Sequence, residues 1–444
     1  MQSKITNPVD TRQGNNIAKS STMLREWKIA KLGELGTLQY GFTASAEKEP
    51  VGPKFLRITD IKGGGRISWE EVPYCRMPDN EFEKYRLRDG DILIARIGAT
   101  TGKTCIVHEI PKAIFASYLI RLQIKDTADP FFVYYMMNTS TYWDQINANK
   151  EGKLKKGVSA SFLKTLEIPL PPLFEQREID KVLGTIKKAI GQQDKIIEAA
   201  KDLKKSLMQK LFREGIGHNE FEENNEIGQM PKDWNIVTIG DVRDSSKGSI
   251  VSGPFGSNIG KRFFVKEGIP LIRGNNLTKG EKLFVEEGFV FITEQKAQEL
   301  RSCTALPDDL IFTAAGTLGQ VGMIPKNSPY AKYIISNKQL RARIDKNKAF
   351  PLFLFYWFSG PTIQRLINQR KGGTSIPVIN LGILRRLPIP LPKLEEQKQI
   401  AHILSTADKK IEVENKRKAA LEELFRTLLH RFMIGEVRLK DVEV

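Results

Sequence analysis

Apolar residues recur at spacings of three and four in two proline-free stretches, one central and one near the C-terminal end. The spacing predicts two long amphipathic helices, and such narrow apolar seams favour packing of one helix on the other as an antiparallel coiled coil. The expected packing residues are Ile179, Leu183, Ile186 and Ile190 in the first helix and Ile400, Leu404, Ile411 and Leu428 in the second.

Polar residues interrupt both seams at mid-helix: Gln193 in the first, and Glu414 and Lys418 in the second. An antiparallel pair aligned at its centres would bring these three side chains together. A central polar layer fixes the register of a coiled coil at some cost in stability. The alternative is that these positions are solvated where the seam frays, and the sequence favours neither interpretation.

A segment at the start of each helix is repeated. Residues 168–179 read IPLPPLFEQREI and residues 389–400 read IPLPKLEEQKQI, with 8 of 12 positions identical at an offset of 221. Weaker matches extend back to Trp27 in the first copy and Trp234 in the second. The chain is therefore two copies of one unit, a globular domain followed by a proline-rich hinge and a helix.

The repeat also gives the expected domain boundaries. These are a flexible leader at 1–22, a first globular domain at 23–167, a hinge and central spacer helix at 168–213, a linker at 214–233, a second globular domain at 234–388, and a hinge, C-terminal spacer helix and tail at 389–444.

The globular parts combine strand and helix patterns. Branched and aromatic residues predict strands at 91–97 and 117–124, and Pro130 and Pro351 open predicted helices at 130–147 and 351–369. The expected fold class is α+β, with two similar globular domains alternating with two long helices that pack as an antiparallel coiled coil.

The charge balance narrows the choice of partner. The formal net charge is +17, and such a surplus attracts polyanions, of which nucleic acid is the first candidate. The three cysteines and four histidines are scattered, which argues against a disulfide framework or a metal site. No apolar run approaches the roughly 18 residues that a membrane span needs, so we expect a cytoplasmic protein.

Two segments resemble catalytic motifs but differ from them in spacing or in residue type. Residues 98–104, GATTGKT, hold three residues between the glycines where a phosphate-binding loop holds four, so a strand-ending turn is favoured, with Lys103 available to DNA phosphate. The tetrad at 129–132, DPFF, lacks the second proline of an adenine methyltransferase. We therefore expect no catalytic residues and no bound cofactor.

Residues suited to DNA binding concentrate in one loop of each copy, between the aromatic helix and the proline-rich hinge. Basic and amide side chains contact phosphates and base edges. The candidates are Lys150, Lys153, Lys155 and Lys156 in the first copy and Gln369, Arg370, Lys371 and Thr374 in the second, together with Lys103. The alternative is that each loop is merely basic and flexible, without specific contacts.

This ordered set of duplicated motifs resembles the specificity subunit of type I restriction-modification enzymes. The resemblance rests on the paired segments at 168–179 and 389–400, on GPFGS at 253–257 and on GIPLIRGN at 268–275. It implies two target-recognition domains alternating with two helices that pack antiparallel, and it covers nearly the whole chain.

The resemblance further implies a DNA-binding subunit whose two recognition domains each read one half of a bipartite target in double-stranded DNA. It implies two methylation subunits and, optionally, two restriction subunits as partners. S-adenosylmethionine, ATP and magnesium would then be bound by the partners. The alternatives are a methyltransferase or nuclease fused to the same domains, and a structural coiled-coil adaptor with a basic surface.

Overall fold

A computed structural model describes residues 27–62, 65–150, 157–370 and 378–439. The fold divides into two compact units, called here unit 1 (residues 1–192 and 418–444) and unit 2 (residues 193–417). Each long helix contributes one half to each unit, so the compact units differ from the sequential copies of the repeat. The expected leader at 1–22 lies outside the described residues.

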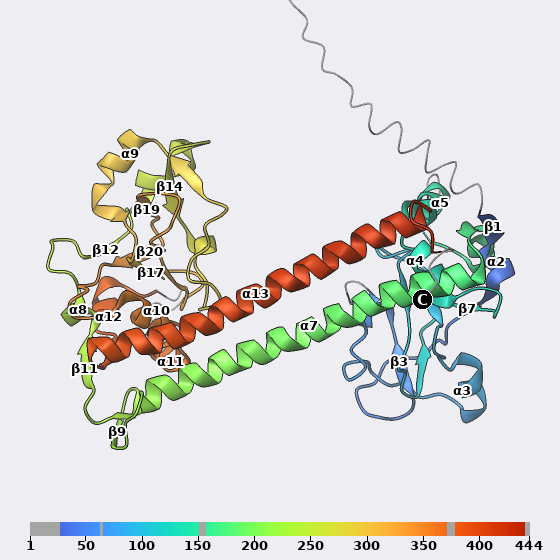
Figure 1. The fold of residues 1–444 in the computed structure, drawn as a ribbon, viewed down its shortest axis with the longest axis horizontal. Helices are drawn as coiled ribbons and strands as arrows, with labels where there is room; N and C mark the ends of the chain where they lie inside the picture. Colours follow the sequence, from blue (N-terminus) through green and yellow to red (C-terminus); the bar gives the residue numbers. More distant parts are fainter. Residues whose placement is uncertain (1–26, 63–64, 151–156, 371–377, 440–444) are drawn as a thin grey trace, which may run out of the picture. The chain divides into compact units, whose positions relative to one another are not determined.

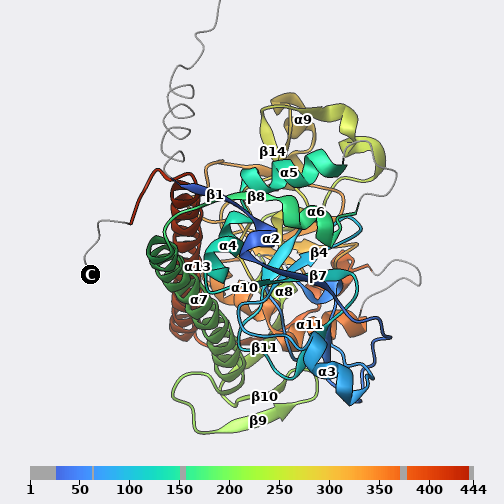
Figure 2. The same ribbon diagram turned by 90° about the vertical axis from the view of Figure 1, so that its right-hand side faces the viewer.

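Unit 1 is a small α+β domain on two helix halves. Its elements are β1 (Lys28–Lys31), α2 (Leu32–Leu35), β2 (Gly36–Tyr40), β3 (Lys54–Leu56), η2 (Ile58–Asp60), α3 (Asp79–Tyr85), β4 (Ile92–Ala95), β5 (Thr104–Ile106), β6 (Ala113–Phe115), β7 (Leu119–Ile124), α4 (Pro130–Met136), α5 (Ser140–Lys150), α6 (Ala160–Thr165) and β8 (Glu167–Leu170), and helix α7 (Leu173–Glu214) follows. Its main sheet has the antiparallel order β2-β7-β4-β5. Figure 2 shows β4 and β7 side by side.

Unit 2 contains more strands. It comprises β9 (Phe221–Asn224), β10 (Gly228–Pro231), β11 (Asn235–Thr238), α8 (Ile239–Val242), β12 (Ile250–Ser252), η4 (Gly256–Ile259), η5 (Lys261–Phe263), β13 (Phe264–Val265), β14 (Ile269–Ile272), η6 (Gly274–Asn276), β15 (Val290–Ile292), α9 (Glu294–Glu299), η7 (Arg301–Cys303), β16 (Thr304–Ala305), β17 (Leu310–Thr313), β18 (Val321–Met323), β19 (Tyr333–Ile335), β20 (Gln339–Ala342), α10 (Pro351–Ser359), α11 (Pro361–Arg370), α12 (Leu381–Arg385) and β21 (Pro388–Leu391), and helix α13 (Leu394–Met433) follows.

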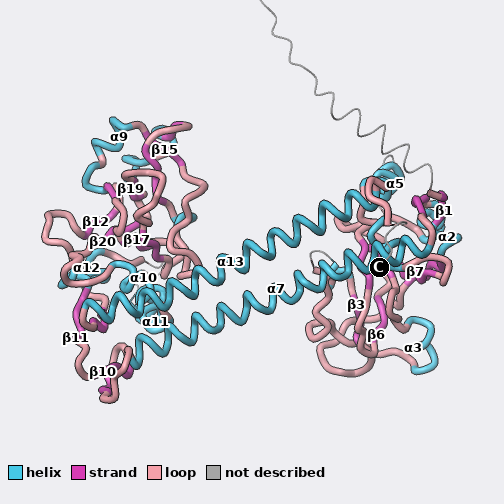
Figure 3. The backbone as a smooth tube through the Cα atoms, in the orientation of Figure 1, coloured by secondary structure: helices cyan, strands magenta, loops and turns pink. Residues whose placement is uncertain are grey.

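The two units share one topology, which confirms the predicted pair of similar α+β domains. The sheet order β2-β7-β4-β5 of unit 1 returns in unit 2 as β12-β20-β17-β18. The parallel pair β3–β6 returns as β14–β19, here inside a five-stranded sheet. The strands are short and joined by long loops, as Figure 3 shows in magenta and pink.

The predicted strands at 91–97 and 117–124 are confirmed as β4 and β7. Each predicted aromatic helix is instead two helices, α4 with α5 and α10 with α11. In unit 2 the break falls at Gly360, before Pro361, whose ring opens the new helix. In unit 1, Asn138 and Thr139 donate side-chain hydrogen bonds to carbonyls of α4 and so end it.

The segment at 214–233, expected as a linker, carries the antiparallel hairpin β9–β10. Asn224 Oδ1 accepts hydrogen bonds from the backbone of Glu226 (2.9 Å) and Ile227 (3.3 Å), which closes the turn. Met230 is buried in the core of unit 2 together with Trp234. Part of the segment, including Ile227 and Met230, therefore packs into the core of the second domain.

The repeated glutamine at the start of each long helix makes the same two bonds in both units. Gln176 Nε2 donates to the Pro171 carbonyl (2.7 Å), and its Oε1 accepts from Asp129 N, just before α4 (2.9 Å). Gln397 does the same with Pro392 (2.8 Å) and Phe350, just before α10 (2.7 Å). Each buried amide therefore ties its long helix to the aromatic helix of its own domain.

The preceding glutamate clamps the end of the other long helix. In unit 1, Glu175 accepts two hydrogen bonds from Arg438, beyond the end of α13 (2.7 and 2.8 Å). In unit 2, Glu396 accepts from Ile216 N, beyond the end of α7 (2.9 Å), and lies 2.8 Å from His218 Nε2. Both units therefore pair the start of one long helix with the end of the other.

The long helices α7 (green in Figure 1) and α13 (red) run antiparallel, as predicted. In unit 1, Ile179 and Leu183 are fully buried in a core cluster that includes Phe432. In unit 2, Ile400 and Leu404 share a cluster with Leu211. The remaining predicted packing residues, Ile186, Ile190, Ile411 and Leu428, are half-buried. Within the described residues, no helix is long and apolar enough to cross a bilayer.

Two of the polar seam residues, Gln193 and Glu414, are buried in unit 2. Gln193 Nε2 donates to Glu414 Oε2 (2.5 Å) and to its backbone carbonyl (3.2 Å), and both side chains are buried. Lys410 and Arg417 pair with the same carboxylate. Lys418 belongs to unit 1, where its Nζ lies 3.7 Å from Glu422 Oε1. The Gln193–Glu414 contact therefore favours the polar-layer interpretation.

A buried ion pair is also repeated. Arg121 on β7 lies 3.4 Å from Asp91, and Arg341 on β20 lies 3.6 Å from Asp309; all four side chains are buried. Burial raises the pKa of the Asp91 carboxyl, because a charged group loses hydration there. In unit 2, Arg343 adds two hydrogen bonds to Asp309 (2.9 and 2.8 Å). Each ion pair joins the residue before one strand, β4 or β17, to the neighbouring strand, β7 or β20.

Replacing Glu414 tests the polar layer. Hydrogen bonds from Lys410 and Gln193 lower the pKa of the Glu414 carboxyl from 4.5 to about 2, so its ionised form stabilises the fold. That contribution is present above pH 4.5 and is lost as the pH falls towards 2. Glu414→Gln should lower the urea midpoint at pH 7, and the gap to wild type should narrow through this range. A gap independent of pH, or an equal loss in the exposed control Glu423→Gln, would contradict this role.

Removing one partner of the buried ion pair should destabilise its unit. Asp309→Ala leaves Arg341 buried without a carboxylate, and we expect a loss of about 3–5 kcal/mol in the free energy of unfolding. Asp91→Ala should act similarly in unit 1. Thermal unfolding followed by circular dichroism measures the effect, and exposed Asp202→Ala on α7 serves as the control. Unchanged melting of both variants would refute a structural role.

Candidate nucleic-acid interface

The two predicted DNA-binding loops return to the same place on the fold. In unit 1, Val158 N donates to the Arg96 carbonyl just after β4 (2.9 Å). In unit 2, Ile379 N donates to the Ala314 carbonyl just after β17 (2.8 Å). Ala315 also forms an antiparallel bridge with Val378, the first described residue after the second loop. Each loop thus rejoins the end of the central strand of its unit.

The candidate residues of unit 1 are only partly described. Lys103 is exposed on the turn between β4 and β5. That turn needs Gly102, whose φ is +90° and where an added Cβ would lie 2.8 Å from Ile146. Lys150 is the last residue of α5, and Lys153, Lys155 and Lys156 lie outside the described residues. The predicted turn is confirmed, while the phosphate contact stays a prediction.

The two described candidates of unit 2, Gln369 and Arg370, are the last residues of α11. Gln369 is exposed there. Arg370 is half-buried, donates to the Arg386 carbonyl (3.0 Å) and forms an ion pair with Glu226. These contacts hold its guanidinium in place at the point where the loop begins. Lys371 and Thr374 lie outside the described residues.

A polar cleft of about 490 Å³ adjoins the return point of the second loop. It is lined by the turns after β14, β17 and β19, and Ala315 is one of its residues. The loop argument from sequence missed its two basic residues, Arg273 and Lys338. The match of Arg273 with Arg57 between the copies is a signal that would have found the first of them.

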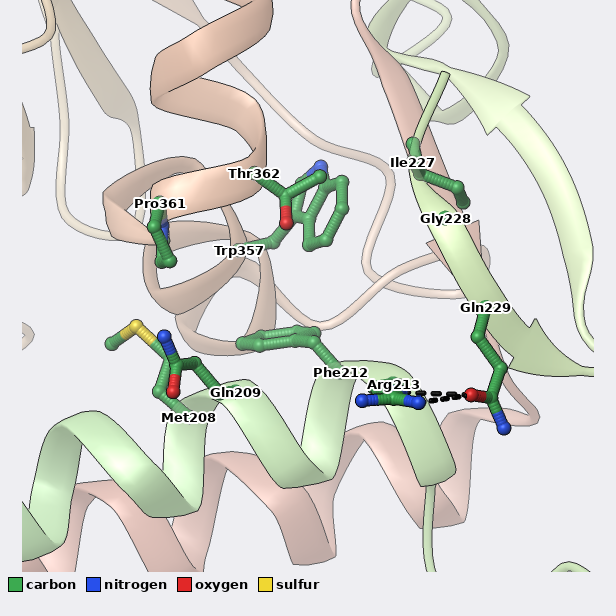
Figure 4. A pocket seen from close by; sticks show the side chains of 11 residues that line it. Met208, Gln209, Phe212, Arg213, Ile227, Gly228, Gln229, Trp357, Pro361 and Thr362 are labelled. Atoms are coloured by element: carbon green, nitrogen blue, oxygen red, sulfur yellow. Dashed lines mark hydrogen bonds between the residues drawn. The ribbon is translucent and has the colours of Figure 1, made fainter. Parts of the chain in front are cut away.

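A second hollow, of about 390 Å³, lies between the end of α7, β10 and the α10–α11 junction (Figure 4). Its floor is apolar, with Phe212 and Trp357 in tilted contact at 5.3 Å between ring centroids. Arg213 Nε donates to Gln229 Oε1 (2.8 Å) at its edge. Of the predicted DNA-binding residues that the structure describes, none lines this hollow.

Comparison with known proteins connects this architecture to one family. The chain matches the profile of the family described as Type I restriction modification DNA specificity domain over residues 25–201 and 231–423. It is 27% identical, over 94% of both chains, to a Methanocaldococcus jannaschii protein named as the MjaX type I restriction enzyme specificity subunit. It is 26% identical to the MjaVIII specificity subunit of the same organism, over 80% of this chain and 81% of the relative.

Solved structures share the fold. The S subunit of a type I restriction-modification system from M. genitalium superposes with a TM-score of 0.54 at 18% identity, covering 91% of this chain and 95% of that one. A chain from a study of the assembly of a type I system gives 0.53 at 16% identity, covering 93% and 98%. Together with the two profile matches, one in each half of the sequence, these likenesses lead to one conclusion. The chain belongs to the family of type I restriction-modification DNA specificity subunits, with two recognition domains.

Proposed function

We propose that each recognition domain reads one half of a bipartite target in double-stranded DNA. One observation carries the proposal: the two copies attach loops of different sequence, 149–157 and 368–375, to the same point of one shared fold. A shared frame with different polar side chains is what two different base sequences require. The net charge of +17 supplies the attraction for the DNA backbone.

We propose further that the chain itself is not catalytic and works with two methylation subunits, and optionally two restriction subunits. S-adenosylmethionine would then be bound by the methylation subunits, and ATP and magnesium by the restriction subunits. Large apolar side chains exposed on the long helices support docking there, since such side chains commonly mark interfaces. They are Phe174, Ile196, Leu203, Val413 and Leu424.

Replacing loop residues tests the division of the target. In the assembly with the methylation subunit, Gln369→Ala with Lys371→Ala should weaken recognition of one half-site, by about 1–3 kcal/mol for each base that is no longer read. Lys155→Ala with Lys156→Ala should affect only the other half-site. Arg370 is left unchanged because its replacement would also break the ion pair with Glu226.

Binding to duplexes altered in one half-site at a time measures both pairs of variants, and methylation mapping in cells supplies the target. Equal losses at both half-sites would argue for general electrostatic attraction. No sequence preference in the wild-type assembly would support the structural adaptor instead.

The absence of catalysis is tested with the purified chain. Incubated with target DNA and labelled S-adenosylmethionine, the chain alone should transfer no methyl groups, whereas the assembly with its methylation subunit should. The chain alone should likewise leave DNA uncut in the presence of magnesium. Methylation or cleavage by the chain alone would favour the fused enzyme and overturn this part of the proposal.

A further inference from the structure

Among its described lining residues, the polar cleft of unit 2 carries two cationic side chains and no acidic one. Arg273 follows β14 directly, and Lys338 lies between β19 and β20; both are exposed. Among the described residues, neither side chain has a hydrogen-bond or ion-pair partner. Two unpaired cations facing one cleft create a local positive potential that favours an anionic ligand.

Gln339, another residue that lines the cleft, adds a side-chain donor. Gln339 is 1% exposed, and its Oε1 accepts a hydrogen bond from Ser336 Oγ. Within the described part of the chain, no acceptor contacts its Nε2. In the neighbouring Gln320, Nε2 donates to the Leu277 carbonyl (3.0 Å), and Oε1 accepts from Thr313 Oγ1 (3.1 Å). Arg273, Lys338 and the Gln339 amide therefore bring three donor side chains to the cleft, which suit the oxygens of an anion.

A turn that contains two glycines borders the cleft and packs against α11. The β17–β18 turn passes through Gly316 (φ +98°) and Gly319 (φ +85°), and a Cβ at Gly319 would lie 1.9 Å from Gln364 Oε1. Residues that carry a Cβ rarely adopt such positive φ angles, so glycine is favoured at both positions. The turn is thus held against α11, the helix that leads into the second DNA-binding loop.

The corresponding arginine of unit 1 is already neutralised. Leu56 pairs with Phe115 as Ile272 pairs with Ile335, so Arg57 and Arg273 occupy equivalent positions after parallel strands. Arg57 forms two hydrogen bonds to Asp60 (3.0 and 2.9 Å). In unit 2 the equivalent residue is the buried Asn276, whose amide donates to the Val285 and Glu287 carbonyls. Of this pair, the arginine of unit 2 is therefore the one left for an external anion.

We propose that this cleft binds one phosphodiester group of the DNA backbone, held by Arg273, Lys338 and the buried amide of Gln339. The proposal rests on the proposed function and adds an anchor that contacts no base. Because Ala315 of the cleft pairs with Val378, a phosphate held here would lie beside the point where the second predicted loop rejoins the fold. The anchor would set the position of that loop on the duplex, as phosphate contacts do in other DNA-binding proteins.

The test uses the assembly with its methylation subunit and a duplex that carries the mapped target. Arg273→Ala and Lys338→Ala should each weaken binding roughly ten-fold and about equally for all sequences, since each removes a charge-assisted hydrogen bond. The slope of log affinity against log salt should fall by about 0.9, because one phosphate is no longer neutralised. Arg301→Ala, an exposed arginine on η7 of the same unit, is the matched control.

Duplexes with a single neutral methylphosphonate then locate the contact. One position should weaken the wild type and leave Arg273→Ala unaffected, and Arg273→Lys should restore part of the wild-type response. Circular dichroism of each variant checks folding. Wild-type affinity in both alanine variants, or a loss confined to particular bases, would overturn the anchor while leaving the proposed function intact.

Two further outcomes also decide the matter. A non-hydrolysable ATP analogue that displaces DNA from wild type, but not from Arg273→Ala, would make the cleft a nucleotide site and refute the DNA anchor. A wild-type assembly that prefers no DNA sequence would refute the proposed function and the anchor together.

Discussion

A buried glutamine and the glutamate before it, at the start of each long helix, constrain the rest of the fold. A glutamine binds the hinge and the start of the aromatic helix, and the preceding glutamate binds the end of the opposite helix. Buried polar groups are costly unless every partner is present. The hinge, the aromatic helix and the two helix ends must therefore come together in each unit, and this requirement accounts for the identity of both residues in the repeated segment.

Much of this architecture is visible in the sequence because it depends on local periodicity and on repetition. The 3/4 spacing predicts α7 and α13, and the repeat predicts two units of one topology. Contacts between residues far apart in the sequence cannot be predicted from periodicity or repetition. The pairing of Arg121 with Asp91 depends on strand neighbours 30 residues apart, and the hairpin at 221–231 on a turn closed by Asn224.

The candidate site, like the fold, is only partly predictable from the sequence. Position and residue type make Lys103, Gln369 and Arg370 candidates from the sequence, and the structure places Lys103 and Gln369 at the surface. The ion pair of Arg370 with Glu226 joins residues 144 positions apart and has no local signature. Arg273 and Lys338 meet only because three turns converge on one cleft. At equivalent positions of the two copies, Asp60 pairs with Arg57, whereas the uncharged Asn276 does not neutralise Arg273.

Gln193 and Glu414 are separated by 221 residues, which is the offset of the repeat, so equivalent positions of the two copies contact each other. If the two copies were identical in sequence, the same residue would occupy both contacting positions. Two glutamates there would repel in a buried setting, and two glutamines would lack a charge to attract Lys410 and Arg417. A donor opposite an acceptor requires the copies to differ. Because both copies belong to one chain, the two residues can differ. A homodimer of a single copy would place the same residue at both positions.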